Sequence, residues 1–155
     1  PVSLWEEDFS RVRQQLASCG ITTARDAEKY LEANSDQIRH LASLIRVIDV
    51  NQATLRLFEA SDKTMLLGSL DPLITEETLG VFRREIPALW ATGSYSGEGA
   101  VVTTTGREIP CLIDVSVAPG CEESWARVFV SILDIHELKH AQEALANTEK
   151  PFPRK

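Results

Sequence analysis

Three consecutive β-type segments, followed at once by a charged helix, are the feature that most limits how this chain can fold. Residues 99–104 and 125–133 are rich in β-branched and aromatic side chains, and residues 108–118 alternate apolar with polar positions. Polar turns that contain Gly106 and Gly120 separate the three segments. Strands joined by connections this short predict an antiparallel meander.

The sequence after Asp134 changes from a strand period to a helical one. Its apolar or small residues recur at three- and four-residue spacing, separated by Glu, Lys, Gln and His, and they are Leu138, Ala141, Leu145 and Thr148. A stripe this narrow is typical of a helix that packs against a partner helix. We therefore expect residues 135–155 to form an outgoing helix and tail, and the chain to form a homodimer.

The N-terminal segment, residues 1–44, has helical periodicity. A capping box is suggested by Ser3 and Glu6, and apolar residues follow at helical spacing up to Gly20: Leu4, Trp5, Phe9, Val12 and Leu16. Residues 23–33 and 36–44 predict two further helices. We expect an N-terminal helical extension here, with the first strand at residues 45–50 and no hairpin partner before it.

The order of the remaining motifs is specific. Residues 45–50 predict a strand, and Asn51 is placed to cap the helix that follows it. In this order the chain resembles the PAS family of sensory domains over residues 45–148. The fragments that carry the resemblance are Asn51-Gln52-Ala53-Thr54-Leu55-Arg56-Leu57-Phe58, Leu67-Gly68, Gly97-Glu98, Gly106-Arg107-Glu108-Ile109-Pro110 and Asp134-Ile135.

The resemblance implies an α+β fold, in which an antiparallel sheet of about five strands is flanked by short helices. The sensor core would span residues 45–134, and the first strand usual in the family would be either lost or replaced. The chain departs from the family pattern at Glu59, where Gly is frequent, at Thr105, where Asp is frequent, and at His136, where Thr is common. The resemblance implies that the end of the last strand passes a signal to the outgoing helix through Asp134, His136, Leu138, Ala141 and Leu145.

For function, the resemblance implies a noncatalytic input and dimerisation domain that relays ligand or partner binding through its C-terminal helix. The implied effector lies downstream in the same parent chain and is a sensor histidine kinase of a two-component system. The alternatives are the input domain of a diguanylate cyclase and a pure protein-interaction module with an empty core. Phosphate-binding loops, nucleophile elbows and paired cysteine spacings do not occur in the sequence, so it predicts no enzyme.

A PAS-like core can hold haem, flavin, a small metabolite or nothing. Haem would need an axial histidine from the middle helices, yet residues 75–92 contain none, and no reactive cysteine lies in the setting of the flavin photosensors. The sequence therefore argues against both groups and leaves a small organic ligand or none. Our candidates for residues that face the pocket are Phe58, Phe82, Trp90, Ile113, Val128 and Val130.

One short motif suggests different chemistry. The segment His136-Glu137-Leu138-Lys139-His140 matches H-E-x-x-H, which on a helix presents two imidazoles and a carboxylate to zinc. A catalytic zinc needs a third protein ligand, and few carboxylates follow His140. We keep the zinc hydrolase as a remote alternative and expect no metal site.

Composition sets the outer limits. A chain of 155 residues that is 43% hydrophobic is ordinary for one globular domain. The net charge of −7 without a basic run argues against nucleic acid and anionic membranes as partners, and no apolar run is long enough to span a bilayer. Three cysteines without paired spacing favour the cytoplasm. Because the chain begins at Pro1, we expect it to be a piece of a longer protein.

Overall fold

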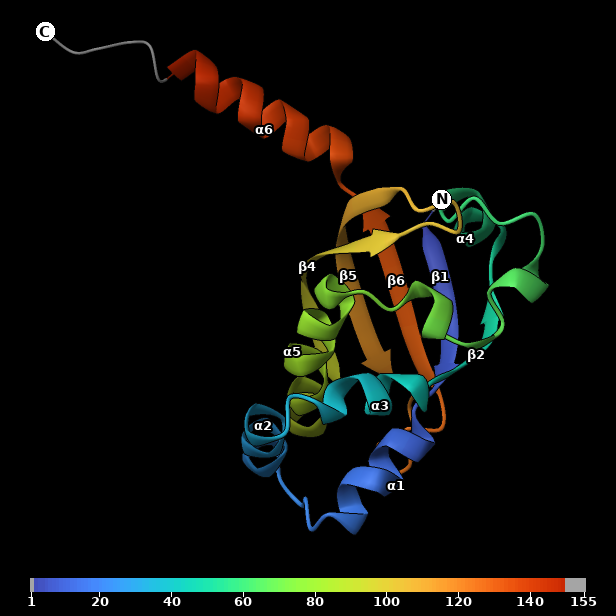
Figure 1. Ribbon diagram of the computed structural model, residues 1–155, viewed down its shortest axis with the longest axis vertical. Coiled ribbons are helices and arrows are strands. Elements are labelled where there is room, and N and C mark those ends of the chain that lie inside the picture. The colour runs from blue at the N-terminus through green and yellow to red at the C-terminus, as the bar shows by residue number, and fades with distance from the viewer. Residues whose placement is uncertain (1, 150–155) are drawn as a thin grey trace, which may run out of the picture.

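The computed structural model describes residues 2–149, which form a six-stranded antiparallel sheet with most of the helices packed on one face (Figure 1). The strands lie in the order β3-β2-β1-β6-β5-β4. The elements are β1 (Ser3–Asp8), α1 (Ser10–Ser18), α2 (Ala24–Ala33), α3 (Gln37–Ser43), β2 (Arg46–Val50), α4 (Gln52–Leu57), the 3-10 helix η1 (Lys63–Met65), β3 (Gly68–Ser69), the 3-10 helix η2 (Asp71–Leu73), α5 (Glu76–Thr92), β4 (Ser94–Val102), β5 (Glu108–Val117), β6 (Val128–Asp134) and α6 (His136–Glu149).

The first strand is present, and it lies in the middle of the sheet. β1 pairs antiparallel with β2 on one side and with β6 on the other. Its side chains alternate, so that Ser3, Trp5 and Glu7 are buried while Leu4 is exposed. The prediction of a helix beginning at Ser3 was therefore wrong, and the segment 1–44 expected to be a helical extension contributes a strand. Pairing on both edges outweighed a weak local helix signal.

Three helices lie between β1 and β2 in the sequence, although the two strands pair directly in the sheet. α1, α2 and α3 gather at one end of the sheet in Figure 1. α2 is the second helix that the sequence predicted, and the Thr23 side chain caps it by accepting a hydrogen bond from the Asp26 amide at 3.0 Å. The indole Nε1 of Trp90 in α5 donates to the Thr22 carbonyl at 3.1 Å, which ties this group of helices to the core.

The antiparallel meander of β4, β5 and β6 is confirmed, with changed boundaries. β4 begins at Ser94, before the predicted strand start at residue 99, so Gly97 also lies within the strand. A Cβ added to Gly99 would lie 2.8 Å from Cγ2 of Val81, and this glycine lets α5 approach the sheet closely. Trp125 lies in the preceding loop with a φ of 58°, so β6 begins only at Val128.

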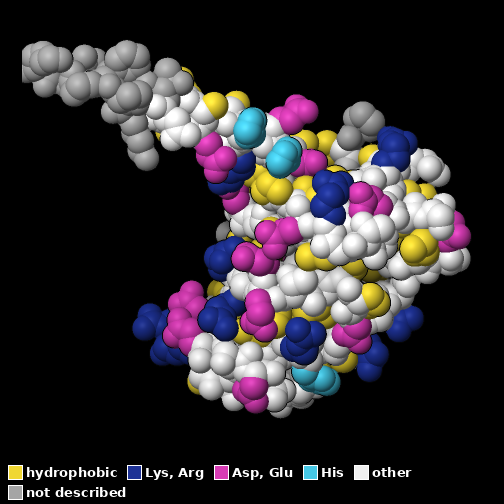
Figure 2. All heavy atoms as spheres, turned by 45° about the horizontal axis from the view of Figure 1, so that its top comes forward, with side chains coloured by type: hydrophobic (Ala, Val, Ile, Leu, Met, Phe, Trp, Pro, Cys, Tyr) yellow, Lys and Arg dark blue, Asp and Glu magenta, His cyan; other side chains and the backbone are white. Residues whose placement is uncertain are grey.

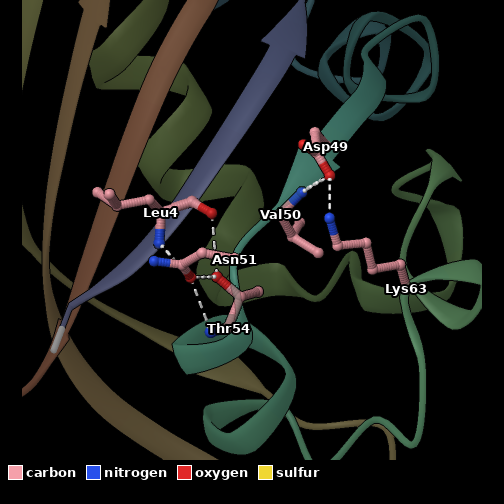
Figure 3. Close-up of polar contacts among 6 residues, drawn as sticks. All are labelled: Leu4, Asp49, Val50, Asn51, Thr54 and Lys63. Atoms are coloured by element: carbon pink, nitrogen blue, oxygen red, sulfur yellow. Dashed lines mark hydrogen bonds and ion pairs between the residues drawn. The ribbon is translucent and has the colours of Figure 1, made fainter.

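Asn51 joins β1, the end of β2 and α4 in one hydrogen-bond network (Figure 3). Its Oδ1 accepts from the Thr54 amide at 3.0 Å, which caps α4 as the sequence predicted, and also from the Leu4 amide at 3.1 Å. Its Nδ2 donates to the Val2 carbonyl at 2.9 Å. The Thr54 hydroxyl lies 2.7 Å from the Ser3 hydroxyl. One amide side chain therefore fixes both a helix start and the position of the first strand.

Two of the departures from the PAS pattern contact each other. Glu59 has a φ of 59°, which lies in the left-handed region that favours glycine. The Thr105 hydroxyl donates a hydrogen bond to the Glu59 carboxylate, and Arg107 Nε lies 3.1 Å from Glu59 Oε2. Hydrogen bonds from Thr105, then Thr103 and Arg107, lower the pKa of Glu59 to about 2. This cluster connects the end of α4 with the β4–β5 turn.

Across residues 2–149, every helix is too short or too polar to traverse a lipid bilayer.

We expect Asn51→Ala to lower the free energy of unfolding by about 2 kcal/mol, because it removes a helix cap and two bonds to the N-terminal strand. Asn51→Asp keeps the acceptor for the Leu4 and Thr54 amides and loses only the donor to Val2, so it should cost less than half as much. Urea denaturation of both variants measures the difference. Equal losses would mean that the shared acceptor is not the stabilising contact.

Candidate functional site

A cavity of about 80 Å³ lies between the inner face of the sheet and α5. Its wall is built from β1, β4, β5 and β6, from α5, and from the segment around η2, and almost all of it is apolar. The lining residues are Trp5, Glu7, Phe58, Leu70, Leu73, Ile74, Thr78, Val81, Phe82, Glu85, Val101, Ile113, Val115, Val130 and Ile132. A volume of this size accommodates a few non-hydrogen atoms and is well below the roughly 300–1,000 Å³ of pockets for drug-sized ligands.

Two carboxyl groups interrupt this apolar wall. The side chains of Glu7 in β1 and Glu85 in α5 line the cavity and are only 5% and 3% exposed. Burial raises the pKa of Glu7 to about 8. Burial also raises the pKa of Glu85, and the nearby Glu7 carboxyl adds to the effect. Burial therefore favours the protonated form of both groups, because a buried charge without a counter-charge is unfavourable.

Four of the six residues that the sequence suggested for the pocket lie in its wall: Phe58, Phe82, Ile113 and Val130. The other two do not line it. Trp90 packs edge-on against Trp125 with ring centroids 5.3 Å apart, and the guanidinium of Arg13 lies 3.9 Å from its ring centre. Val128 is fully buried at the end of β6 far from Asp134. Arg13 of α1 and the Thr22 carbonyl before α2 thus contact Trp90 where a ligand was expected, and Val128 pairs with Glu7 of β1.

The sequence did not suggest either carboxyl residue of the wall, Glu7 or Glu85. Glu7 was assigned to a helix, although the alternation of Ser3, Trp5 and Glu7 fits the buried face of a strand. Glu85 lies on α5 between Val81 and Leu89 at four-residue spacing, so it falls on the buried face of that helix. A carboxylate on an otherwise apolar helix face was the signal that could have identified it.

One strand of the cavity wall, β6, continues directly into α6. β6 carries the cavity residues Val130 and Ile132 and ends at Asp134, whose Oδ1 accepts a hydrogen bond from the His136 amide at 2.8 Å. The Asp134 carboxylate therefore occupies the start of α6, where negative charge interacts favourably with the helix dipole.

Two further contacts fix the first turn of α6 to the sheet. The Ile135 amide donates to the Pro110 carbonyl of β5 at 3.0 Å. Lys139 Nζ lies 2.8 Å from Glu98 Oε1 of β4, although both side chains are largely exposed and the pair is weak on its own. The first turn of α6, which we call the root of the helix, is thus attached to three neighbouring strands.

Beyond its first turn, α6 projects away from the domain (Figure 1). The side chains of Leu138 and Leu145 are 55% and 60% exposed, and Ala141 between them is exposed as well. Residue 148, the last position of the predicted stripe, lies in the helix, but its side chain is outside what the structure describes. The stripe has no packing partner among residues 2–149.

The two histidines of the H-E-x-x-H segment lie at the root of α6, and Figure 2 shows imidazole side chains on the surface there. The rings of His136 and His140 are stacked with centroids 6.5 Å apart. Within residues 2–149, no group of three or more His, Cys, Asp or Glu side chains is arranged to hold a metal ion. The zinc interpretation therefore has no third ligand in the described part of the chain.

The cysteine side chains are free thiols in different surroundings. Cys111 is fully buried in β5, where burial and the nearby Asp134 carboxylate raise the pKa of its thiol to about 12. It remains a protonated core residue and a poor nucleophile. Cys19 is exposed, and Cys121 is partly buried.

Comparison with solved structures supports a PAS-like fold. The PAS domain of a LuxR-family transcriptional regulator from Burkholderia thailandensis, in complex with ethanol, matches with a TM-score of 0.50 and 20% identity over 58% of this chain and 80% of that chain. A structure from a study of a flavin analogue and the light-oxygen-voltage domain mechanism matches with a TM-score of 0.54 and 12% identity over 97% of this chain and 89% of that chain. No family model matches the sequence, and no curated protein matches it either.

We expect the free energy of unfolding to fall as the pH rises from about 5 to about 8. The folded protein retains the Glu7 proton in this range, whereas the unfolded chain releases it near pH 4.5. One such group therefore lowers the free energy of unfolding by up to about 1.4 kcal/mol per pH unit. Glu7→Gln should flatten this part of the profile, and Glu108→Gln, at an exposed position on β5, should not. Urea titrations across this pH range measure the slope, and parallel profiles for all three proteins would contradict the assignment.

Proposed function

We propose that this PAS-like domain is a noncatalytic sensory input module, which converts the occupancy of its cavity into a change at the root of α6. The observation that carries this proposal is the continuity of β6. Ile132 lines the cavity, and Asp134, two residues further on, accepts the hydrogen bond that starts the helix. An occupant that displaces Ile132 would therefore act on the helix start through a segment too short to absorb the movement.

The partner hypothesis rests on the exposed stripe of α6. Two large apolar side chains on one face of a projecting helix are typical of a two-helix coil, so we propose a homodimer joined through Leu138, Ala141 and Leu145. A coil would carry a change in helix position to a downstream effector in the parent chain.

We favour a histidine kinase as this effector, with a diguanylate cyclase as the alternative. We also propose a cytoplasmic location, which free thiols favour.

The size of the cavity favours a small organic ligand over haem or flavin. A ligand of a few non-hydrogen atoms fits about 80 Å³, whereas a flavin ring system would require the core to expand. None of the cavity residues is a histidine or a cysteine, so an axial donor for haem and a thiol for flavin photochemistry are missing from the wall. The Burkholderia thailandensis PAS domain is described with ethanol, a molecule of the size expected here.

We expect the double variant Leu138→Asp/Leu145→Asp to be monomeric at concentrations where the unmodified protein is dimeric, because two charges would be placed in the apolar seam of the coil. The matched control is His140→Asp/Asn147→Asp, which adds two charges at the same spacing on another face of α6. Light scattering coupled to size-exclusion chromatography gives the mass of each protein. A dimeric Leu138→Asp/Leu145→Asp variant would exclude α6 as the interface.

Coupling between the cavity and α6 predicts a response to a small change in the cavity wall. Ile132→Val removes one methylene group next to the cavity and should raise amide hydrogen exchange in residues 136–147 by about threefold or more. The control, Ile38→Val, removes the same group from a fully buried position on α3, outside the cavity wall, and should leave exchange in α6 unchanged. If neither variant alters α6, the sensory relay is wrong.

A further inference from the structure

The cavity contains acidic groups without the positive partner that buried acids usually have. Glu7 and Glu85 are the only ionisable residues in its wall, and no Lys, Arg or His lines it. Within residues 2–149, no side-chain hydrogen bond or ion pair joins either carboxyl group to another residue, although both residues are more than nine-tenths buried. Buried carboxyl groups are normally paired or hydrogen-bonded, so two unpartnered ones that face the same cavity indicate a missing ligand group.

The chemistry of the wall narrows the class of that ligand. An anion would meet two acids and no positive charge. A divalent metal ion would need about six oxygen ligands, and the wall offers only two carboxyl groups and the hydroxyl of Thr78. A positively charged organic molecule suits this wall better. Its charged group supplies the counter-charge that the two acids lack, and its carbon skeleton can pack against the aliphatic side chains of the wall.

The aromatic side chains of the wall also favour a cation. Trp5 and Phe58 line the cavity and pack edge to face, with ring centroids 5.0 Å apart, and Phe82 lines it from α5. The negative face of an aromatic ring attracts an ammonium group, and the attraction is strongest where water is excluded. The net charge of −7 further raises the local concentration of cations around the protein.

We propose that the cavity binds a compact alkylammonium ion, whose ammonium group lies between Glu7 and Glu85 and whose alkyl group packs against the aliphatic wall. This inference rests on the proposed sensory function of the same cavity and names the ligand class. With a volume of about 80 Å³, the cavity limits the alkyl group to a few carbon atoms.

Binding is coupled to the release of one proton. The O–H bond of one carboxyl group breaks, its proton passes to the solvent, and the resulting carboxylate pairs with the ammonium group. The second carboxyl group keeps its proton, and its carbonyl oxygen accepts a hydrogen bond from the ammonium group. The two Glu side chains are the only titratable groups that face the ligand from the strands, α5 and the η2 segment, so no other group takes up the proton.

The test is isothermal titration of the whole chain with isobutylammonium chloride at pH 7, in two buffers of different ionisation enthalpy. Isobutanol serves as the neutral probe, because it has the same carbon skeleton with a hydroxyl group in place of the ammonium group. We expect isobutylammonium to bind more tightly than isobutanol and to release about one proton. Glu7→Gln and Glu85→Gln should each weaken its binding by about tenfold or more, whereas the surface control Glu108→Gln should not.

Three results would overturn the inference: no binding of isobutylammonium, equal binding of isobutanol, or unchanged binding by both glutamine variants. Circular dichroism of the variants verifies that they are folded, and glutamine preserves the shape of glutamate. These outcomes are separate from failure of the sensory function. A cavity that binds isobutanol and still alters exchange in α6 when Ile132 is shortened would remain a sensor, but of a neutral ligand.

Discussion

The pairing of β1 with both β2 and β6 is the constraint on which the rest of the structure depends. It joins the two halves of the sheet, because β2 and β3 reach the meander of β4, β5 and β6 only through β1. It also carries Trp5 and Glu7 into the core, so the same strand supplies part of the cavity wall. Asn51 secures this arrangement by holding the start of β1 and the start of α4 at once. Without β1, the cavity would lose one side, and β2 and β6 would each present a further open strand edge.

The two buried carboxyl groups lower the stability of the core. Two carboxyl groups in an apolar wall stabilise the fold less than two well-packed aliphatic side chains of similar volume would, and burial without a counter-charge raises the pKa of both. The close approach of α5 to β4 at Gly99 supplies packing elsewhere that helps to offset this cost. Cores that combine strain or unpaired polar groups with rigid surroundings are characteristic of binding sites, where a ligand completes the interactions that the fold leaves open.

Local signals were read correctly from the sequence, and nonlocal ones were not. The Asn51 cap, the meander and the helix after Asp134 follow from turn residues, periodicity and capping chemistry within a few positions of each other. The strand at residues 3–8 was missed because Ser3 and Glu6 imitate a helix cap, and only pairing with distant residues such as Ile132 decides between the two structures. The same limit applies to the site. Phe82 and Trp90 are both aromatic residues of α5, but the inserted helices cover Trp90, and no local pattern in α5 reveals where those helices pack.

The central place of β1 also has a consequence for the order in which the chain can fold. Within this domain, Ser3 leaves the ribosome long before its partner Ile132. Until β6 is synthesised, β1 can have a neighbour on one edge only, and Trp5 has no complete core to enter. The closing step therefore joins the two ends of the domain, which gives a high contact order and slow final assembly. A nascent domain of this kind keeps an unpaired strand edge exposed for longer than a fold that grows from one end to the other. Until β6 is synthesised, α1, α2 and α3 are the early elements that can pack near β1.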